Sequence, residues 1–255
     1  GGERNWDYRF CWLRDASMTM TALVEAGYID EARDWRNWLL RAIAGDPEQQ
    51  QIMYAVDGTR RLPEIQLPWL SGYEGSSPVR LGNGAASQFQ LDVPAEVLDA
   101  LMVARRAGLP PDPHTWSMAE VIMNHVDGIW QQPDEGIWEV RGGAQNFVYS
   151  KVMAWVAADR AAWQRDDGKR WRDLADKIHA DVMANGFDAD RNTFVQAYGS
   201  KALDASLLQI PLVGFLPADD PRVVGTVAAI ERELVTDGFV ARYLTDDAAS
   251  DGLSG

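Results

Sequence analysis

Apolar residues recur every three or four positions along most of the chain, which is the spacing of amphipathic helices. These runs follow residues that start helices and precede glycines that end them. The sequence therefore predicts eight helices. They span residues 15–26, 30–44, 92–106, 115–129, 151–165, 169–184, 204–209 and 220–234. Asp15, Asp30, Ser150 and Asp220 are the predicted N-caps of four of them.

Strand-like patterns occur only between the predicted helices. Short strands are predicted at residues 51–56, 193–198 and 238–244. The loop at 46–88 is rich in glycine and proline and is longer than most loops of compact domains, which is typical of functional loops. A second long loop, 131–149, contains an apolar and acidic stretch at 136–140.

The helices form four consecutive pairs with strands only in the connections, so the predicted fold class is all-α. No repeat, low-complexity tract or linker interrupts residues 1–255, and we expect one domain over the whole chain. The chain begins abruptly at Gly1-Gly2 and ends inside a glycine-rich loop, 251–255. We therefore expect this domain to be incomplete.

Charge and composition narrow the function classes. The 255 residues include 24 Lys and Arg and 38 Asp and Glu, a formal net charge of −14, which argues against nucleic-acid and anionic-membrane partners. No apolar run approaches the roughly 18–20 residues of a membrane span. The N-terminal residues lack the basic and apolar regions of a signal peptide, so we expect a cytoplasmic protein.

Cysteine and histidine point to no disulfide framework and no metal centre. Cys11 is the one cysteine, which excludes an intrachain disulfide. The histidines, His114, His125 and His179, lie far apart on predicted helices and lack the spacing of zinc ligands.

Tryptophan is unusually frequent, with 11 residues against 7 tyrosines and 7 phenylalanines. Its flat apolar ring with one N–H donor suits stacking on the C–H faces of sugars. Large rings also fill helical cores, so composition leaves both roles open.

One candidate cluster for sugar binding lies near the N-terminus. Tyr8 and Trp12 offer rings, and Arg14 and Asp15 offer adjacent donors and acceptors. A guanidinium and a carboxylate together can grip neighbouring hydroxyls of a sugar while the rings cover its faces. The alternative is an N-cap aspartate beside a structural ion pair, and the residue types favour neither.

A second candidate is Glu139, which lies between Trp138 and Val140. A carboxyl group that apolar neighbours desolvate has a raised pKa and keeps its proton near neutral pH, as a general acid must. The alternative is a surface strand in which apolar and acidic residues alternate.

A third cluster lies near the C-terminus, where Arg242, Tyr243 and Asp246 again combine a donor, a ring and an acceptor. A solvated strand end is the alternative. Hydrolysis of a glycoside needs two carboxyl groups, one as acid and one as base or nucleophile. Residue types alone do not select the second one.

Taken together, these segments resemble the catalytic domain of glycoside hydrolase family 15, which contains glucoamylases, glucodextranases and bacterial trehalases. The resemblance covers essentially the whole chain, and the combination of motifs is specific. It is carried by residues 5–15, 51–54, 72–74, 79–83, 90–93, 133–140, 150–155 and 204–208. Tyr149, where a histidine is expected, and residues 93–95 depart from the family pattern.

The resemblance implies an (α/α)6 toroid of twelve helices. The eight predicted helices then correspond to four of its six hairpins, with an N-terminal β-sandwich and the C-terminal helices absent. Inner helical surface would be uncovered, so we expect self-association.

The resemblance also implies exo-hydrolysis of an α-glucosidic bond with inversion and release of glucose, without a cofactor. Glu139 corresponds to the general acid, and the general base would lie beyond residue 255. The substrate would be trehalose or a malto- or isomalto-oligosaccharide. The implied substrate-binding residues are Tyr8, Trp12, Arg14, Asp15, Trp138, Arg242, Tyr243 and Asp246.

Two alternatives remain at the level of sequence. A non-catalytic carbohydrate-binding protein, or an inactive fragment, is consistent with a missing general base. An epimerase or lyase on a similar helical barrel would typically need histidine in the loops, whereas the three histidines here fall on predicted helices.

Overall fold

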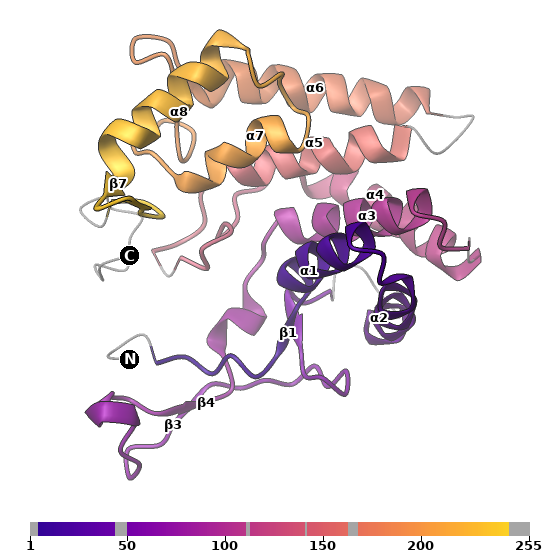
Figure 1. Ribbon diagram of the computed structural model, residues 1–255, viewed down its shortest axis with the longest axis vertical. Helices are drawn as coiled ribbons and strands as arrows, with labels where there is room; N and C mark the ends of the chain where they lie inside the picture. The colour runs from indigo at the N-terminus through magenta and orange to yellow at the C-terminus, as the bar shows by residue number, and fades with distance from the viewer. Residues whose placement is uncertain (1–4, 44–49, 111–112, 141, 163–167, 245–255) are drawn as a thin grey trace. The chain divides into compact units, whose positions relative to one another are not determined.

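The computed structural model describes residues 5–43, 50–110, 113–140, 142–162 and 168–244 (Figure 1). The chain forms two compact units, one from residues 1–89 and 100–118 and the other from 90–99 and 119–255. The boundary between the units falls within two helices, α3 (Asp92–Arg106) and α4 (Pro113–Ile129). The single domain expected over 1–255 stays a prediction.

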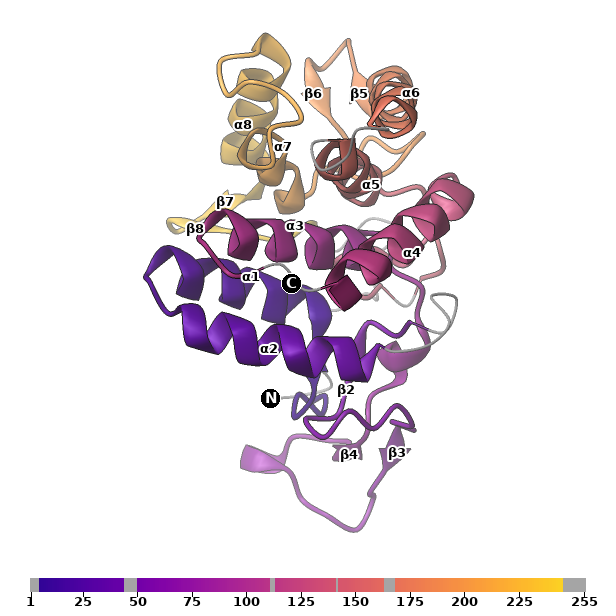
Figure 2. The same cartoon turned by 90° about the vertical axis from the view of Figure 1, so that its right-hand side faces the viewer.

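The first unit is built on a helical hairpin. Helices α1 (Leu13–Glu25) and α2 (Ile29–Ala42) lie side by side (Figure 2). Met20, Val24 and Ala32 of this hairpin form a buried apolar cluster with Ala104 and Leu109. The remaining elements of this unit are β1 (Cys11–Trp12), β2 (Met53–Tyr54), β3 (Ile65–Gln66), η3 (Tyr73–Gly75), β4 (Arg80–Leu81) and η4 (Gly84–Ser87).

The second unit is built around α5 (Val148–Ala162), which packs along α6 (Lys169–Asn185). Helix α5 is buried almost all round, with Val152, Ala154 and Val156 each at 0% exposure, so it forms the centre of this unit. The other elements are β5 (Phe187–Asp188), β6 (Thr193–Phe194), η5 (Ala205–Leu208), α7 (Gln209–Leu212), α8 (Pro221–Leu234), β7 (Val235–Thr236) and β8 (Phe239–Val240).

Within the residues that the structure describes, the strands form four antiparallel pairs of two strands each, β1–β2, β3–β4, β5–β6 and β7–β8. In the first pair, Cys11 lies opposite Tyr54 and Trp12 opposite Met53. This pairing holds the N-terminal aromatic cluster against the start of the long loop.

Helix α8 packs closely on the β5–β6 turn. Thr226 Oγ1 accepts a hydrogen bond from the Phe194 backbone N–H at 2.9 Å. A Cβ atom on Gly225 would lie 2.1 Å from the Asn192 carbonyl oxygen, so this contact requires glycine.

Several predicted bounds agree with the structure. Helix α3 has the predicted ends, and α8 begins directly after its predicted cap, Asp220, whose side chain accepts from the Arg222 N–H at 2.9 Å. The strand predicted at 51–56 is reduced to β2, and the helix predicted at 204–209 is the turn η5 followed by the short α7.

Three predicted N-caps are wrong. Trp12 precedes α1 and Tyr28 precedes α2, which puts Asp15 and Asp30 in the first helical turns. Carboxylates at those positions still favour the helix because they face the positive end of its dipole. Ser150 lies inside α5, and its hydroxyl donates to Asp134 Oδ2 at 2.7 Å instead of capping the helix.

No helix within the described residues is long and apolar enough to cross a membrane. The described residues also contain no group of three or more His, Cys, Asp or Glu side chains that could hold a metal ion.

Candidate active site

The aromatic residues of the N-terminal cluster pack against one another in the first unit. The ring centroids of Tyr8 and Trp12 are 5.8 Å apart, and those of Phe10 and Trp12 are 6.2 Å apart. Trp12 is buried, whereas Tyr8 is 64% exposed. The structure thus offers an exposed tyrosine ring on a buried tryptophan.

Arg14 and Asp15 begin α1 with very different exposure. The Arg14 side chain is 9% exposed and that of Asp15 is 70% exposed, and their closest nitrogen and oxygen atoms are 3.6 Å apart. That distance is too long for a hydrogen bond. Asp15 is not an N-cap, so its carboxylate presents acceptors to solvent, as a sugar contact requires.

Asp7 anchors this cluster and was not selected from the sequence. Its buried carboxylate accepts from Arg9 Nε at 2.8 Å, Arg9 Nη2 at 2.7 Å and the Gly82 N–H at 3.0 Å. The hydrogen bonds from Arg9 hold the pKa of Asp7 below its ordinary value. A Cβ atom on Gly82 would lie 1.9 Å from the Pro63 carbonyl oxygen, so this close approach needs glycine.

Glu139 lies in a tight turn of the second unit. We call residues 134–140 the acid turn. The Glu139 N–H donates to the Gly136 carbonyl and the Val140 N–H to the Glu135 carbonyl, each at 3.2 Å. Glu139 has a φ of 57° and Gly136 a φ of 70°. The alternative of an alternating surface strand at 136–140 is therefore wrong, because strands do not contain such left-handed positions.

Arg242 contacts Trp138, the residue that precedes Glu139 in the acid turn. The Arg242 guanidinium carbon lies 5.0 Å from the centroid of the Trp138 ring, a cation–π distance. Trp138 also packs on a small apolar core of Val140, Phe147 and Ala197. The structure thus brings together two of the segments that were singled out separately. Tyr243 is buried at 8% exposure, and Asp246 lies outside the described residues.

Asp204 is the residue of this region that sequence reasoning missed. Its buried carboxylate accepts from Trp138 Nε1 at 2.9 Å, Gln196 Nε2 at 3.0 Å and the Ser206 N–H at 2.8 Å. The one available signal is its position at the start of the 204–208 motif, which by itself predicts only the beginning of a helix.

Residues 2–255 match the protein family described as glycosyl hydrolases family 15. The chain belongs to this family. Two solved structures resemble the fold, a glycosidase variant in complex with glucose and the glucoamylase from Saccharomycopsis fibuligera. The match to the glycosidase variant has a TM-score of 0.74 at 19% identity, and it covers 94% of this chain and 64% of the glycosidase chain. The match to the glucoamylase has a TM-score of 0.68 at 14% identity, and it covers 99% of this chain and 61% of the glucoamylase chain. The predicted fold class, all-α of the (α/α)6 toroid type, is confirmed.

The curated relatives of this chain are longer than the chain itself. A trehalase from Thermoplasma acidophilum is 41% identical over 261 residues, which is 100% of this chain and 44% of the relative. A trehalase from Mycobacterium tuberculosis is 42% identical over 263 residues, which is 100% of this chain and 38% of the relative. The isomaltose glucohydrolase of Kribbella flavida is 28% identical over 253 residues, which is 93% of this chain and 62% of the relative. The chain spans about two fifths of the length of these trehalases.

The first residue of the acid turn, Asp134, is a buried aspartate that makes both backbone and side-chain hydrogen bonds. Asp134 pairs with Gln145 through two backbone hydrogen bonds of 2.9 and 2.8 Å. Its Oδ2 accepts from Ser150 Oγ at 2.7 Å and from the Leu91 N–H at 3.1 Å. Burial, together with the nearby charge of Asp92, raises the pKa of Asp134 to about 7.

Lys151, in helix α5, hydrogen-bonds to the beginning of the 131–149 loop. Its buried ammonium group donates to the Trp130 carbonyl at 2.7 Å and the Gln132 carbonyl at 2.6 Å. Burial lowers the pKa of Lys151 to about 8. Tyr149, which departs from the family pattern, donates to Glu96 Oε1 at 2.7 Å and is buried, so it acts here as a packing residue.

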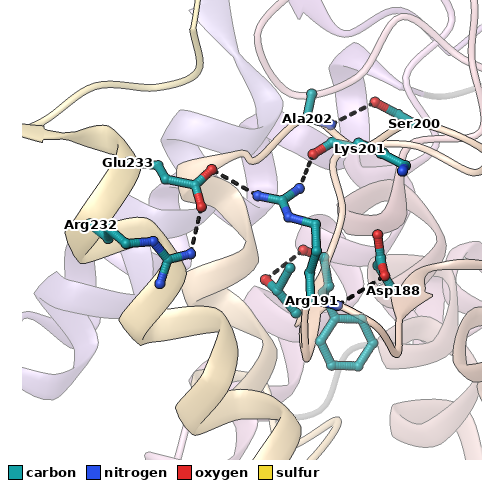
Figure 3. A network of polar contacts seen from close by, with 9 residues as sticks. Asp188, Arg191, Ser200, Lys201, Ala202, Arg232 and Glu233 are labelled. Carbon is teal, nitrogen blue, oxygen red and sulfur yellow. Dashed lines mark hydrogen bonds and ion pairs between the residues drawn. The ribbon is translucent and has the colours of Figure 1, made fainter.

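A polar network supports the segment that leads to Asp204 (Figure 3). Arg191, in the β5–β6 turn, donates to Glu233 Oε2 of α8 at 2.7 Å and also to the Lys201 carbonyl. Its backbone N–H donates to Asp188 Oδ1 at 3.1 Å, and Arg232 adds a second hydrogen bond to Glu233 at 2.6 Å. The network joins three segments within the second unit.

Arg191→Ala is expected to lower the free energy of unfolding by about 1–2 kcal/mol, because a mostly buried ion pair and a hydrogen bond to a carbonyl are lost together. Urea denaturation measures it. Arg170→Ala is the matched control, since Arg170 pairs with Asp127 at 2.6 Å while 55% exposed and should contribute about 0–1 kcal/mol. An equal loss for both variants would contradict a supporting role for Arg191.

Proposed function

We propose that the protein is an inverting, exo-acting hydrolase of α-glucosidic bonds that releases glucose from non-reducing ends. The observation that carries this proposal is the Arg242 guanidinium stacked on the ring of Trp138, the residue that directly precedes Glu139 in the acid turn. A proton donor next to a ring and a fork of N–H donors suits a sugar whose leaving oxygen must be protonated. Membership of family 15 and the trehalases among its relatives support the same reaction.

In this reaction Glu139 donates its proton to the glycosidic oxygen as the bond to the anomeric carbon breaks. A water molecule attacks that carbon from the opposite face, and a second carboxylate about 6.5–9.5 Å from the acid takes the proton of the water. We assign the second carboxylate to no residue of this chain. Arg242 would donate to sugar hydroxyls from its place on Trp138. In the first unit, Tyr8, Trp12, Arg14 and Asp15 are proposed to bind a glucose unit.

Trehalose is the proposed substrate. The trehalases are about 41–42% identical to this chain, whereas the isomaltose glucohydrolase is 28% identical. Trehalose is uncharged, so a net charge of −14 does not repel it. Maltose and isomaltose are the competing substrates.

The proposal is tested by incubating the intact protein with trehalose, maltose and isomaltose and recording proton NMR spectra before the products equilibrate. Inversion of trehalose should yield α- and β-glucose in equal amounts at first, because only the attacked anomeric carbon changes configuration. Maltose, if cleaved, should yield β-glucose from its non-reducing unit. Production of α-glucose alone from trehalose would contradict inversion. Binding of trehalose without glucose release would instead identify a non-catalytic carbohydrate-binding protein.

A further inference from the structure

The Asp204 carboxylate is an unusual junction, because it collects donors from three separate segments while only 2% exposed. Oδ1 accepts from Trp138 Nε1 at 2.9 Å and from the Ser206 N–H at 2.8 Å. Oδ2 accepts from Gln196 Nε2 at 3.0 Å and lies 3.1 Å from the same indole nitrogen. Both oxygens are therefore used as acceptors.

A carboxylate offers acceptors on both of its oxygens. An asparagine has one oxygen, and its amide group would face an N–H donor at the other position. A residue that merely capped η5 would need only the hydrogen bond from the Ser206 N–H. The Asp204 carboxylate also accepts from Gln196 and from the Trp138 indole, so it holds the indole in addition to capping η5.

Ala205, the residue after Asp204, contacts the segment that carries Arg242. The Ala205 backbone N–H donates to the Arg242 carbonyl oxygen at 2.8 Å. The guanidinium of Arg242 in turn lies over the Trp138 ring. Residues 204 and 205 thus contact both the segment that carries the guanidinium and the segment that carries the indole.

Glu139 depends on the same anchor because it directly follows Trp138. Its backbone has left-handed torsion angles, and its N–H donates back to Gly136 within the acid turn. A turn of this kind has few ways to adjust, so a shift of the Trp138 backbone would also shift the backbone that carries the Glu139 carboxyl.

We propose that Asp204 is a positioning residue that, through the Trp138 indole, sets the placement of the Glu139 carboxyl relative to the Arg242 guanidinium. This inference rests on the proposed function. Asp204 touches no reacting atom. It acts by holding the proton donor in the geometry that proton transfer requires, and misplacement by about 1 Å can cost on the order of 100-fold in rate.

The kinetic test compares Asp204→Asn, Trp138→Phe and the double variant in the intact protein with trehalose. Asp204→Asn should lower kcat/KM by about 10–100-fold, mainly through kcat. Trp138→Phe keeps a ring for Arg242 but removes the indole donor, so it should lower kcat/KM in the same way. Both variants break the same hydrogen bond between Trp138 and Asp204. The kcat/KM of the double variant should therefore be no more than about twofold below that of the worse single variant.

Asp220→Asn is the matched control. Asp220 also accepts backbone and side-chain hydrogen bonds at a helix start, from Arg222, but contacts neither the acid turn nor Arg242 in the described contacts. The same chemical change there should leave kcat/KM within about twofold of wild type. An equal fall in Asp220→Asn would show that loss of a cap explains the result and would overturn the inference.

A structural readout does not depend on turnover. The indole N–H resonance of Trp138 is identified in a ¹H–¹⁵N NMR spectrum as the signal missing from Trp138→Phe. It should shift in Asp204→Asn and stay in place in Asp220→Asn, because only the first change alters its acceptor.

The outcomes separate the two hypotheses. A wild-type protein that cleaves none of the α-glucosides refutes the proposed function. An active protein whose Trp138→Phe variant retains wild-type kcat/KM overturns the positioning role, even if Asp204→Asn does not fold. Losses that multiply in the double variant, or an unshifted indole signal in Asp204→Asn, also overturn it.

Discussion

Glu139→Gln in the intact protein is expected to lower kcat on trehalose by about 10²–10⁴-fold with little change in KM, because general acid catalysis typically contributes a factor of that size. Glutamine keeps the shape of the side chain and a hydrogen-bonding amide, but it has no proton to give to the leaving oxygen. Steady-state kinetics of glucose release measures the loss.

Two comparisons distinguish a lost proton from a lost sugar contact. The decrease should be much smaller on an aryl α-glucoside, whose leaving group needs little protonation. Asp15→Asn should instead raise KM and lower kcat on both substrates alike, since Asp15 is proposed to contact the sugar. Equal losses on the two substrates for Glu139→Gln would move the acid role to another carboxyl, with Glu135 of the same turn as the next candidate.

Asp134 is expected to make the protein less stable as the pH rises from about 4 to 7. Its pKa is raised from an ordinary 3.8 to about 7 in the folded chain. Over this range the unfolded chain has released the proton that the folded chain keeps, so stability present at low pH is lost as the folded pKa is approached. Three pK units correspond to at most about 4 kcal/mol.

Asp134→Asn isolates this effect because asparagine resembles the protonated acid and does not titrate. The difference in unfolding free energy between wild type and variant, from urea denaturation, should fall steadily from pH 4 to 7. Titrating groups that do not interact with Asp134 cancel in that difference. Above pH 8 wild type should gain stability, because the folded chain releases the proton of Lys151 before the unfolded chain does. A difference that is flat between pH 4 and 7 would show that Asp134 is ionised throughout.

Much of the helical framework could be predicted from the sequence. The bounds of α3 and α8 follow from apolar spacing combined with strong local signals, such as the Asp220-Pro221 start of α8. Local signals failed where a distant partner competed for the side chain. Ser150 resembles a cap in sequence, yet its hydroxyl bonds to Asp134, which a local pattern does not reveal.

Part of the candidate site could likewise be predicted from the sequence, and part could not. Glu139 could be selected because a tryptophan next to an acid is visible in sequence. Its turn could not, because alternation at 136–140 fits a strand and carries no sign of left-handed torsion angles. Asp204 stayed hidden because its principal partner, Trp138, is 66 residues away. The arrangement of this region depends on hydrogen bonds between loops, and such contacts produce no periodic pattern in the sequence.

The left-handed backbone of Glu139 has a consequence for how this protein can evolve. Such torsion angles cost a non-glycine residue on the order of 1 kcal/mol or more, and glycine or asparagine would adopt them more readily. The position proposed to hold the proton donor is thus one where the backbone alone favours a different residue. Directed evolution for heat resistance without a selection for turnover would tend to discard this glutamate. A thermostability campaign on this protein therefore needs residue 139 held constant as glutamate.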